Sequence, residues 1–126
     1  MKRSGTINAP IARKEDSIIE RTISANGDTA VTHYFVISES NGYSLVRFVL
    51  ETGRTHQIRV HSKFIEHPIL GDTLYGQSSA LIGRQALHAY KVELISPLTN
   101  RIIHCTAPIP NDIQEVINKL KLGTGL

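Results

Sequence analysis

The chain has 126 residues, enough for one domain with a hydrophobic core but too few for two. Its hydrophobic content of 40% and charged content of 20% are ordinary for a globular protein, and no apolar run approaches the roughly 20 residues of a membrane span. Cys105 is the one cysteine, which excludes an internal disulfide and fits a reducing cytoplasm. The net charge of +3 permits a polyanionic partner without requiring one, and by itself favours an ordinary basic cytoplasmic protein.

A β-hairpin is predicted over residues 32–51. Residues 32–38 are rich in aromatic and β-branched side chains, and residues 43–51 alternate as a returning strand should. The Asn41-Gly42 pair between them is a strong turn signal. The face expected to join the core carries Ser44, Val46, Phe48 and Leu50.

Gly53 ends this strand, and Thr55 is suited to cap a helix over residues 56–66. The predicted apolar arc of that helix consists of Ile58, Val60, His61, Phe64 and Ile65. The predicted polar arc consists of His56, Arg59, Ser62, Lys63 and Glu66. This distribution is typical of an amphipathic helix that covers a sheet.

Two more strands are predicted over residues 86–95 and 101–107, around a turn at residues 96–100. A final helix is expected to begin at residues 110–112. Its core stripe consists of Ile113, Val116, Ile117 and Leu120. The predicted fold class is therefore α+β, with a mixed, mainly antiparallel sheet and flanking helices.

Basic side chains crowd the start of the first predicted helix. Arg54, His56 and Arg59 add positive charge where the helix dipole is already positive, and Arg59 and Lys63 are like charges four residues apart. Such an arrangement favours an anion, either a phosphate or a carboxylate from elsewhere in the fold. A solvated basic face, satisfied by water and Glu66, explains the same pattern.

Other catalytic arrangements fit poorly. His56 and His61 are five residues apart, whereas two zinc-ligating histidines on one helix are four apart, so we expect no metal site. His61 lies on the apolar arc and is expected to be a hydrogen-bonded core residue. Asp72, beside Gly71, is expected to be a structural turn residue rather than a nucleophile. His104 and Cys105 are adjacent in a strand and should point to opposite faces.

The string LETGRTHQIRVH at residues 50–61 resembles a signature of RluA/RluD-type RNA pseudouridine synthases. Further matches to the family, spread over nearly the whole chain, are residues 10–11, 30–34, 67–72, 75–76, 84–89 and 107–110. The resemblance implies isomerisation of uridine to pseudouridine in RNA, mostly ribosomal RNA, without a cofactor or metal. The target base is flipped into the active site in this family.

The family's catalytic aspartate lies in a His-Arg-Leu-Asp motif and pairs with an arginine. By position, that arginine matches Arg59. Arg54 matches a second motif arginine and looks suited to phosphate or to bracing the turn. The resemblance thus implies that Arg59 is the catalytic partner of the aspartate, and that Arg54, His56 and Lys63 contact RNA.

The 126 residues contain no His-Arg-Leu-Asp motif, and Tyr34 does not match the family's catalytic tyrosine. We therefore expect residues 1–126 to be the C-terminal portion of the catalytic domain, as an expressed fragment, a truncated gene product or half of a split protein. Two functions remain open. One is an enzyme half that is inactive alone, and the other is a non-catalytic RNA-binding remnant. Exposed sheet edges are expected to promote self-association.

Overall fold

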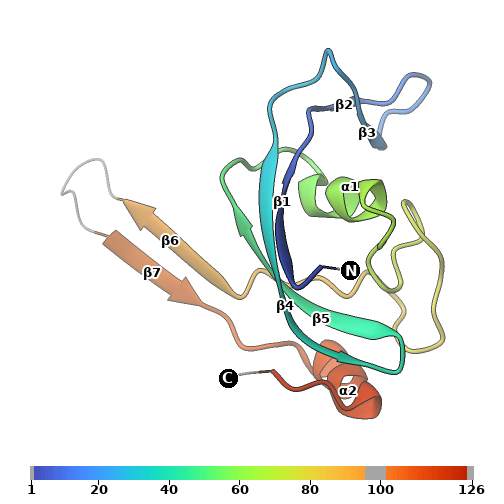
Figure 1. Ribbon diagram of the computed structural model, residues 1–126, viewed down its shortest axis with the longest axis vertical. Coiled ribbons are helices and arrows are strands. Elements are labelled where there is room, and N and C mark those ends of the chain that lie inside the picture. The colour runs from blue at the N-terminus through green and yellow to red at the C-terminus, as the bar shows by residue number, and fades with distance from the viewer. Residues whose placement is uncertain (1, 96–101, 125–126) are drawn as a thin grey trace.

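A three-stranded antiparallel sheet organises the computed structural model, which describes residues 2–95 and 102–124. Its strand order is β1 (Ser4–Asn8), β4 (Val31–Ser40) and β5 (Tyr43–Leu50). At the turn between β4 and β5, Asn41 and Gly42 have φ angles of 55° and 81°, as a tight hairpin turn requires. The predicted hairpin is confirmed, and the fold class is α+β with antiparallel sheets and two helices (Figure 1).

The predicted core face of β5 is confirmed at Val46 and Phe48, whereas Ser44 is exposed. Val46 and Phe48 pack against a cluster made by Ile7, Ala9, Tyr34 and Val36. Leu50 was expected in the same core but is exposed, because this cluster does not reach the end of the edge strand β5. On the opposite face, Leu45 packs against the cluster formed around the second helix. Both faces of β5 therefore contribute to the interior.

Helix α1 (Gln57–Phe64) packs beside β3 and β4 (Figure 1). The prediction that Thr55 caps it is wrong: His56 is the N-cap, in a left-handed conformation with φ 57° and no side-chain cap bond. The reason is the buried Gln57 carboxamide, whose Oε1 accepts the Arg54 N–H at 3.0 Å and closes the turn from inside.

The predicted arcs of α1 need correction at two positions. Val60 and His61 are buried as expected, but Phe64 is 54% exposed and Ser62 is buried. Phe64 is the last residue of the helix. It lies beside Lys2 and β1 rather than in a core cluster. The buried face of α1 therefore includes the small polar Ser62 and excludes Phe64, in contrast to the prediction.

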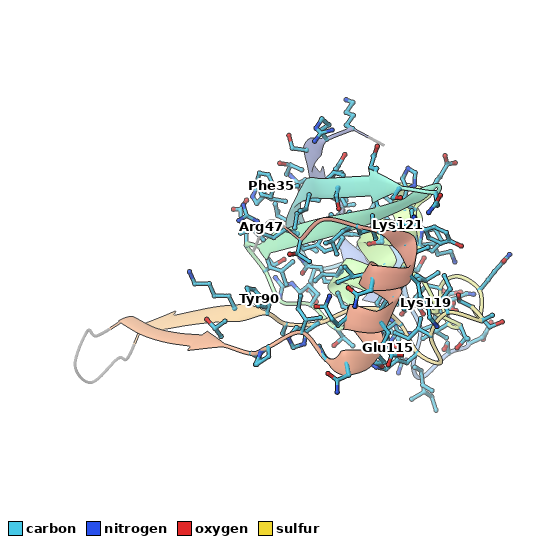
Figure 2. All side chains as sticks on the ribbon, turned by 90° about the horizontal axis from the view of Figure 1, so that it is seen from below. Phe35, Arg47, Tyr90, Glu115, Lys119 and Lys121 are labelled. Atoms are coloured by element: carbon cyan, nitrogen blue, oxygen red, sulfur yellow. The ribbon has the colours of Figure 1, made fainter. Side chains whose placement is uncertain are left out.

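Helix α2 (Asn111–Leu120) begins after Pro110, as predicted, and all four residues of its expected stripe are buried. Those residues are Ile113, Val116, Ile117 and Leu120, and they form one cluster with Ile82 and Leu122. Figure 2 labels Glu115 and Lys119 on α2 and Lys121 just after it, and all three side chains are exposed.

Two small hairpins complete the described chain. One pairs β2 (Ile11–Arg13) with β3 (Arg21–Ile23), and the other pairs β6 (Lys91–Ile95) with β7 (Ile102–Thr106). The strand predicted from residue 86 begins only at Lys91, because Ala86 N–H instead donates to the carbonyl of Leu70. The predicted turn at residues 96–100 lies outside the described residues. The β6–β7 hairpin extends away from the rest of the chain as an arm (Figure 1).

Strands β1, β2 and β3 were not predicted, since each is short and lacks a clear alternation. Neither helix in the described part of the chain is long and apolar enough to span a membrane.

Candidate active site around Arg59

Arg59, in the first turn of α1, is bound by Asp72 through two parallel hydrogen bonds. Its Nε donates to Oδ2 at 2.9 Å and its Nη2 donates to Oδ1 at 2.7 Å. The Arg59 side chain is 15% exposed and that of Asp72 is fully buried. Sequence reasoning left phosphate and carboxylate open as the anion at this helix start. In the structure the anion is a carboxylate, so Arg59 is not an unpaired charge.

Asp72 is held in place by a tight turn. Its Oδ1 accepts the backbone N–H groups of Leu74 at 3.1 Å and Tyr75 at 3.2 Å. The preceding Gly71 has φ 77°, and a Cβ at that position would lie 2.2 Å from the carbonyl oxygen of Arg84. Only glycine fits there. Asp72 is therefore the structural turn residue that was predicted, but its pairing with Arg59 was missed.

The electrostatics of the pair favour two charged groups. Burial by itself raises the pKa of Asp72. The hydrogen bonds from Arg59 and from the N–H groups of Tyr75 and Leu74 outweigh burial, and the net pKa lies below its ordinary value. The pKa of Arg59 is raised, chiefly by its hydrogen bond to Asp72. The pair thus stays ionised at any physiological pH.

Tyr75 joins Arg59 to His56. The Arg59 guanidinium lies over the Tyr75 ring, 5.1 Å from its centroid. The Tyr75 hydroxyl accepts the backbone N–H of Arg21 at 2.8 Å and lies 2.7 Å from His56 Nδ1. Burial, followed by the charges of Arg59 and Arg21, lowers the pKa of His56. The hydrogen bond between His56 Nδ1 and the Tyr75 hydroxyl fixes the imidazole next to Arg59.

A second polar chain runs beneath α1 and includes two residues that sequence reasoning missed. His61 Nε2 lies 2.9 Å from the carbonyl oxygen of Ala9 and must donate, so Nδ1 accepts the Thr32 hydroxyl at 2.8 Å. Thr32 in turn accepts an N–H from Gln57 at 2.9 Å. The prediction of a hydrogen-bonded core histidine is confirmed, and burial lowers its pKa. Threonine and glutamine carry no periodic signal that would have revealed this network.

The other predicted site residues lie before α1, at its N-cap and in its last turn. Arg54 is exposed, and its Nε donates to the carbonyl of Thr29 at 2.8 Å, which braces the turn. Lys63 is exposed on α1, and His56 is half-buried against Tyr75. The structure thus brings His56 and Arg59 together, while Arg54 and Lys63 remain on the surface. No three potential metal ligands cluster in residues 2–95 or 102–124.

Arg59 retains unused hydrogen-bonding capacity. Its bonds to Asp72 use Nε and Nη2, and Nη1 has no partner within the described residues. A guanidinium has five donors in a rigid plane, so one that is oriented by a buried carboxylate can still bind a second acceptor. The arrangement presents an oriented cation rather than a nucleophile or a metal centre.

Comparisons with known proteins identify the family of this chain. A sequence model of RNA pseudouridylate synthases matches residues 1–63, half of the chain, and the chain belongs to this family. The RluA/RluD-type resemblance is confirmed by curated relatives. The RNA pseudouridine synthase YjbO of Bacillus subtilis is 50% identical over 113 residues, which cover 90% of this chain and 40% of YjbO.

Ribosomal large subunit pseudouridine synthase D of Haemophilus ducreyi is 39% identical over 135 residues, covering 96% of this chain and 42% of that protein. The chain therefore spans about two fifths of the length of these relatives. Among solved structures, human RNA pseudouridylate synthase domain containing 4 has a TM-score of 0.71 at 24% identity. The match covers 97% of this chain and 58% of the human chain, so the two share a fold.

Proposed function

We propose that residues 1–126 form the C-terminal portion of a pseudouridine synthase catalytic domain and supply its active-site arginine. The reaction would be isomerisation of uridine to pseudouridine in RNA, without a cofactor. Ribosomal RNA is the proposed substrate because several relatives are ribosomal large subunit pseudouridine synthases. The cytoplasm is the proposed location. The observation that carries the proposal is Arg59, oriented by Asp72 and left with free donors.

The proposed role of Arg59 is to hold a second carboxylate, that of the family's His-Arg-Leu-Asp aspartate. A carboxylate bonded to arginine remains ionised, which a group that attacks the uridine requires. These 126 residues contain no such motif. We therefore propose that a segment carrying the aspartate completes the site, and that the present chain has no synthase activity alone.

The proposed RNA surface consists of Arg54, His56 and Lys63. The outer nitrogens of Arg54 have no hydrogen-bond partner in the described part of the chain, because only Nε is bound to Thr29. Arg54 and Lys63 are exposed cations, which suit backbone phosphates, and His56 is the half-buried N-cap of α1. With a net charge of +3 we expect weak binding, about 10⁻⁴ to 10⁻⁶ M, that falls steeply with salt.

The activity test uses tritium release from carbon 5 of uridine in ribosomal RNA transcripts. The chain alone should release no more than a protein-free control. Mixed with a separately made fragment that carries the His-Arg-Leu-Asp segment, it should recover turnover. Arg59→Lys should abolish that turnover, because a point charge cannot replace the planar fork. Lys121→Gln, on the exposed side of α2, is the control that should retain it.

Because Arg59 also binds Asp72, thermal unfolding of each variant is recorded beside its activity. Turnover by the chain alone would contradict the proposed dependence on a second segment. Recovered turnover that persists in folded Arg59→Lys would contradict the role of Arg59.

The alternative is a non-catalytic RNA-binding remnant. It is favoured only by the missing motif, and it predicts salt-dependent RNA binding with no recovered turnover. Arg54→Ala should weaken RNA binding under either function. Binding that does not change between low and physiological salt would contradict both.

Self-association through exposed sheet edges stays a prediction. The two strands β6 and β7 pair with each other and with no other described strand. Each therefore presents an open edge, and an isolated two-stranded hairpin is only marginally stable in water. Light scattering across the micromolar range should detect dimers or larger species, whereas a monodisperse monomer would contradict this prediction.

A further inference from the structure

The loop between β2 and β3 exposes two adjacent isoleucines. Ile18 is 85% exposed and Ile19 is 64% exposed, more than any other large hydrophobic side chain in the described part of the chain. Single exposed apolar residues are common, but two neighbours at the tip of a hairpin form a small apolar surface of their own. Such a surface suits a partner that covers it.

This loop is braced rather than loose. Lys14 N–H donates to the Glu20 carbonyl at 2.9 Å, and the two side chains form an ion pair at 2.7 Å. Arg21 Nη1 donates to the carbonyls of Ile18 at 3.4 Å and Ile19 at 3.2 Å. The tip is therefore ordered before any partner arrives, which lowers the entropic cost of binding.

The hairpin carries three basic and three acidic side chains, and two of the basic ones, both arginines, lie at the base of its loop. Arg13 and Arg21 lie directly opposite each other in the β2–β3 ladder. Like charges in that position are unfavourable unless something compensates them. Neither arginine forms an ion pair with a carboxylate in residues 2–95 and 102–124. The loop carboxylates Glu15 and Asp16 are exposed, and neither forms an ion pair with Arg13 or Arg21.

The hairpin is also continuous with the Arg59 site. Arg21 donates its backbone N–H to the Tyr75 hydroxyl, and the Tyr75 ring lies under the Arg59 guanidinium. Helix α1 contacts β3, and the β2–β3 hairpin lies beside α1 in Figure 1. An RNA strand whose target base reaches Arg59 would have its neighbouring nucleotides within reach of this hairpin.

We propose that the β2–β3 hairpin is a second RNA-contacting element, in which Ile18 and Ile19 pack against an unstacked nucleobase and Arg13 and Arg21 meet an adjacent phosphate. This inference rests on the proposed function, because it extends the same RNA beyond the Arg59 site. Base flipping leaves neighbouring bases partly unstacked, and an apolar tip can cover the faces that they expose.

The first test places a fluorescent reporter at the tip. The chain contains no tryptophan, so Ile18→Trp introduces a single one. Titration with a uridine-rich single-stranded RNA oligonucleotide should quench its fluorescence, since nucleobases stack on exposed indoles. Ile37→Trp, at a 37% exposed position of β4, is the matched control and should show no quenching.

The second test measures affinity. The double variant Ile18→Ser with Ile19→Ser should bind the same RNA roughly tenfold more weakly, within the range found for loss of base contacts. Its salt dependence should be unchanged, because no cation is removed. Arg13→Gln should instead reduce the steepness of the plot of log binding constant against log salt concentration, by less than one unit of slope. Ile37→Ser should change neither quantity.

The outcomes separate this inference from the proposed function. Salt-sensitive RNA binding that depends on Arg54, without quenching of Ile18→Trp and without loss in the double serine variant, would overturn the inference alone. Absence of RNA binding by the unmodified chain would overturn both. If the double serine variant converts a dimer to a monomer in sedimentation while RNA affinity is unchanged, the tip is a protein contact and the inference is wrong.

Discussion

Two arginine–aspartate pairs in this chain have the same geometry and very different surroundings. Arg59 and Asp72 bond through Nε–Oδ2 at 2.9 Å and Nη2–Oδ1 at 2.7 Å. Arg84 and Asp112 bond through the same atoms at 2.9 Å and 3.0 Å. The side chains of the first pair are 15% and 0% exposed, and those of the second are 42% and 46% exposed.

The comparison shows that burial, not bond geometry, determines what such a pair does. Arg84 and Asp112 fasten the segment before β6 to the start of α2, where water competes for every donor. Asp72 lies out of water and also accepts two backbone N–H groups, so it sets the orientation of Arg59. The inner pair therefore fixes the position of a guanidinium out of water, while the outer pair connects two segments at the surface. Figure 2 shows another exposed arginine, Arg47, whose guanidinium lies 4.9 Å from the centroid of the Phe35 ring.

The largest expected effect separates the two pairs directly. Asp72→Asn removes one partner of a buried ion pair and should lower the free energy of unfolding by about 3–5 kcal/mol. Asp112→Asn removes the equivalent partner at the surface and should change it only slightly. Urea unfolding followed by circular dichroism measures both variants. Equal losses would show that burial does not distinguish the pairs.

A smaller effect is expected at Gly71. This residue precedes Asp72 of the inner pair and lies against the backbone carbonyl of Arg84 of the outer pair. Gly71→Ala combines a left-handed backbone with a contact of 2.2 Å and should cost about 2–3 kcal/mol. Gly42→Ala is the matched control, since Gly42 has φ 81° but no atom within 4 Å of an added Cβ. It should lose only about 1 kcal/mol. The difference in urea midpoint between the two variants measures the crowding alone, and no difference would contradict it.

The smallest effect concerns pH and the buried His61. Its pKa is lowered by burial, so the unfolded chain binds a proton more readily than the folded chain. This contribution to stability is complete above the ordinary histidine pKa of about 6.5 and declines as pH falls below it. His56, whose pKa is also lowered, acts in the same direction.

Between pH 7.5 and 5.5 the free energy of unfolding should therefore fall, by at most about 1.4 kcal/mol per pH unit for each histidine. Urea unfolding at several pH values measures this slope, and His61→Gln should reduce it even if the variant is less stable at pH 7.5. A slope that is the same in both proteins would exclude His61 as its source.

Several features followed from the sequence alone because they depend on local order. Asn41-Gly42 sets the β4–β5 turn, and the stripe from Ile113 to Leu120 faces the core at helical spacing. The family signature at residues 50–61 identified Arg59 as the arginine of interest. His61 was placed in the core because it lies on an apolar arc. Each of these inferences needs only a short continuous segment of the chain.

Only the tertiary structure determined the hydrogen-bond partners of the site and core residues. Arg59 and Asp72 are separated by 13 positions, and Gln57 reaches Thr32 across 25. No periodicity connects such pairs, because a hydrogen bond between distant segments depends on how the helix packs on the sheet. The left-handed His56 shows the same principle at short range, since the buried Gln57 carboxamide accepts the Arg54 N–H and fixes the turn before the helix. The sequence by itself predicted Arg59 as the site arginine, and only the folded chain showed that the buried Asp72 holds its guanidinium in place.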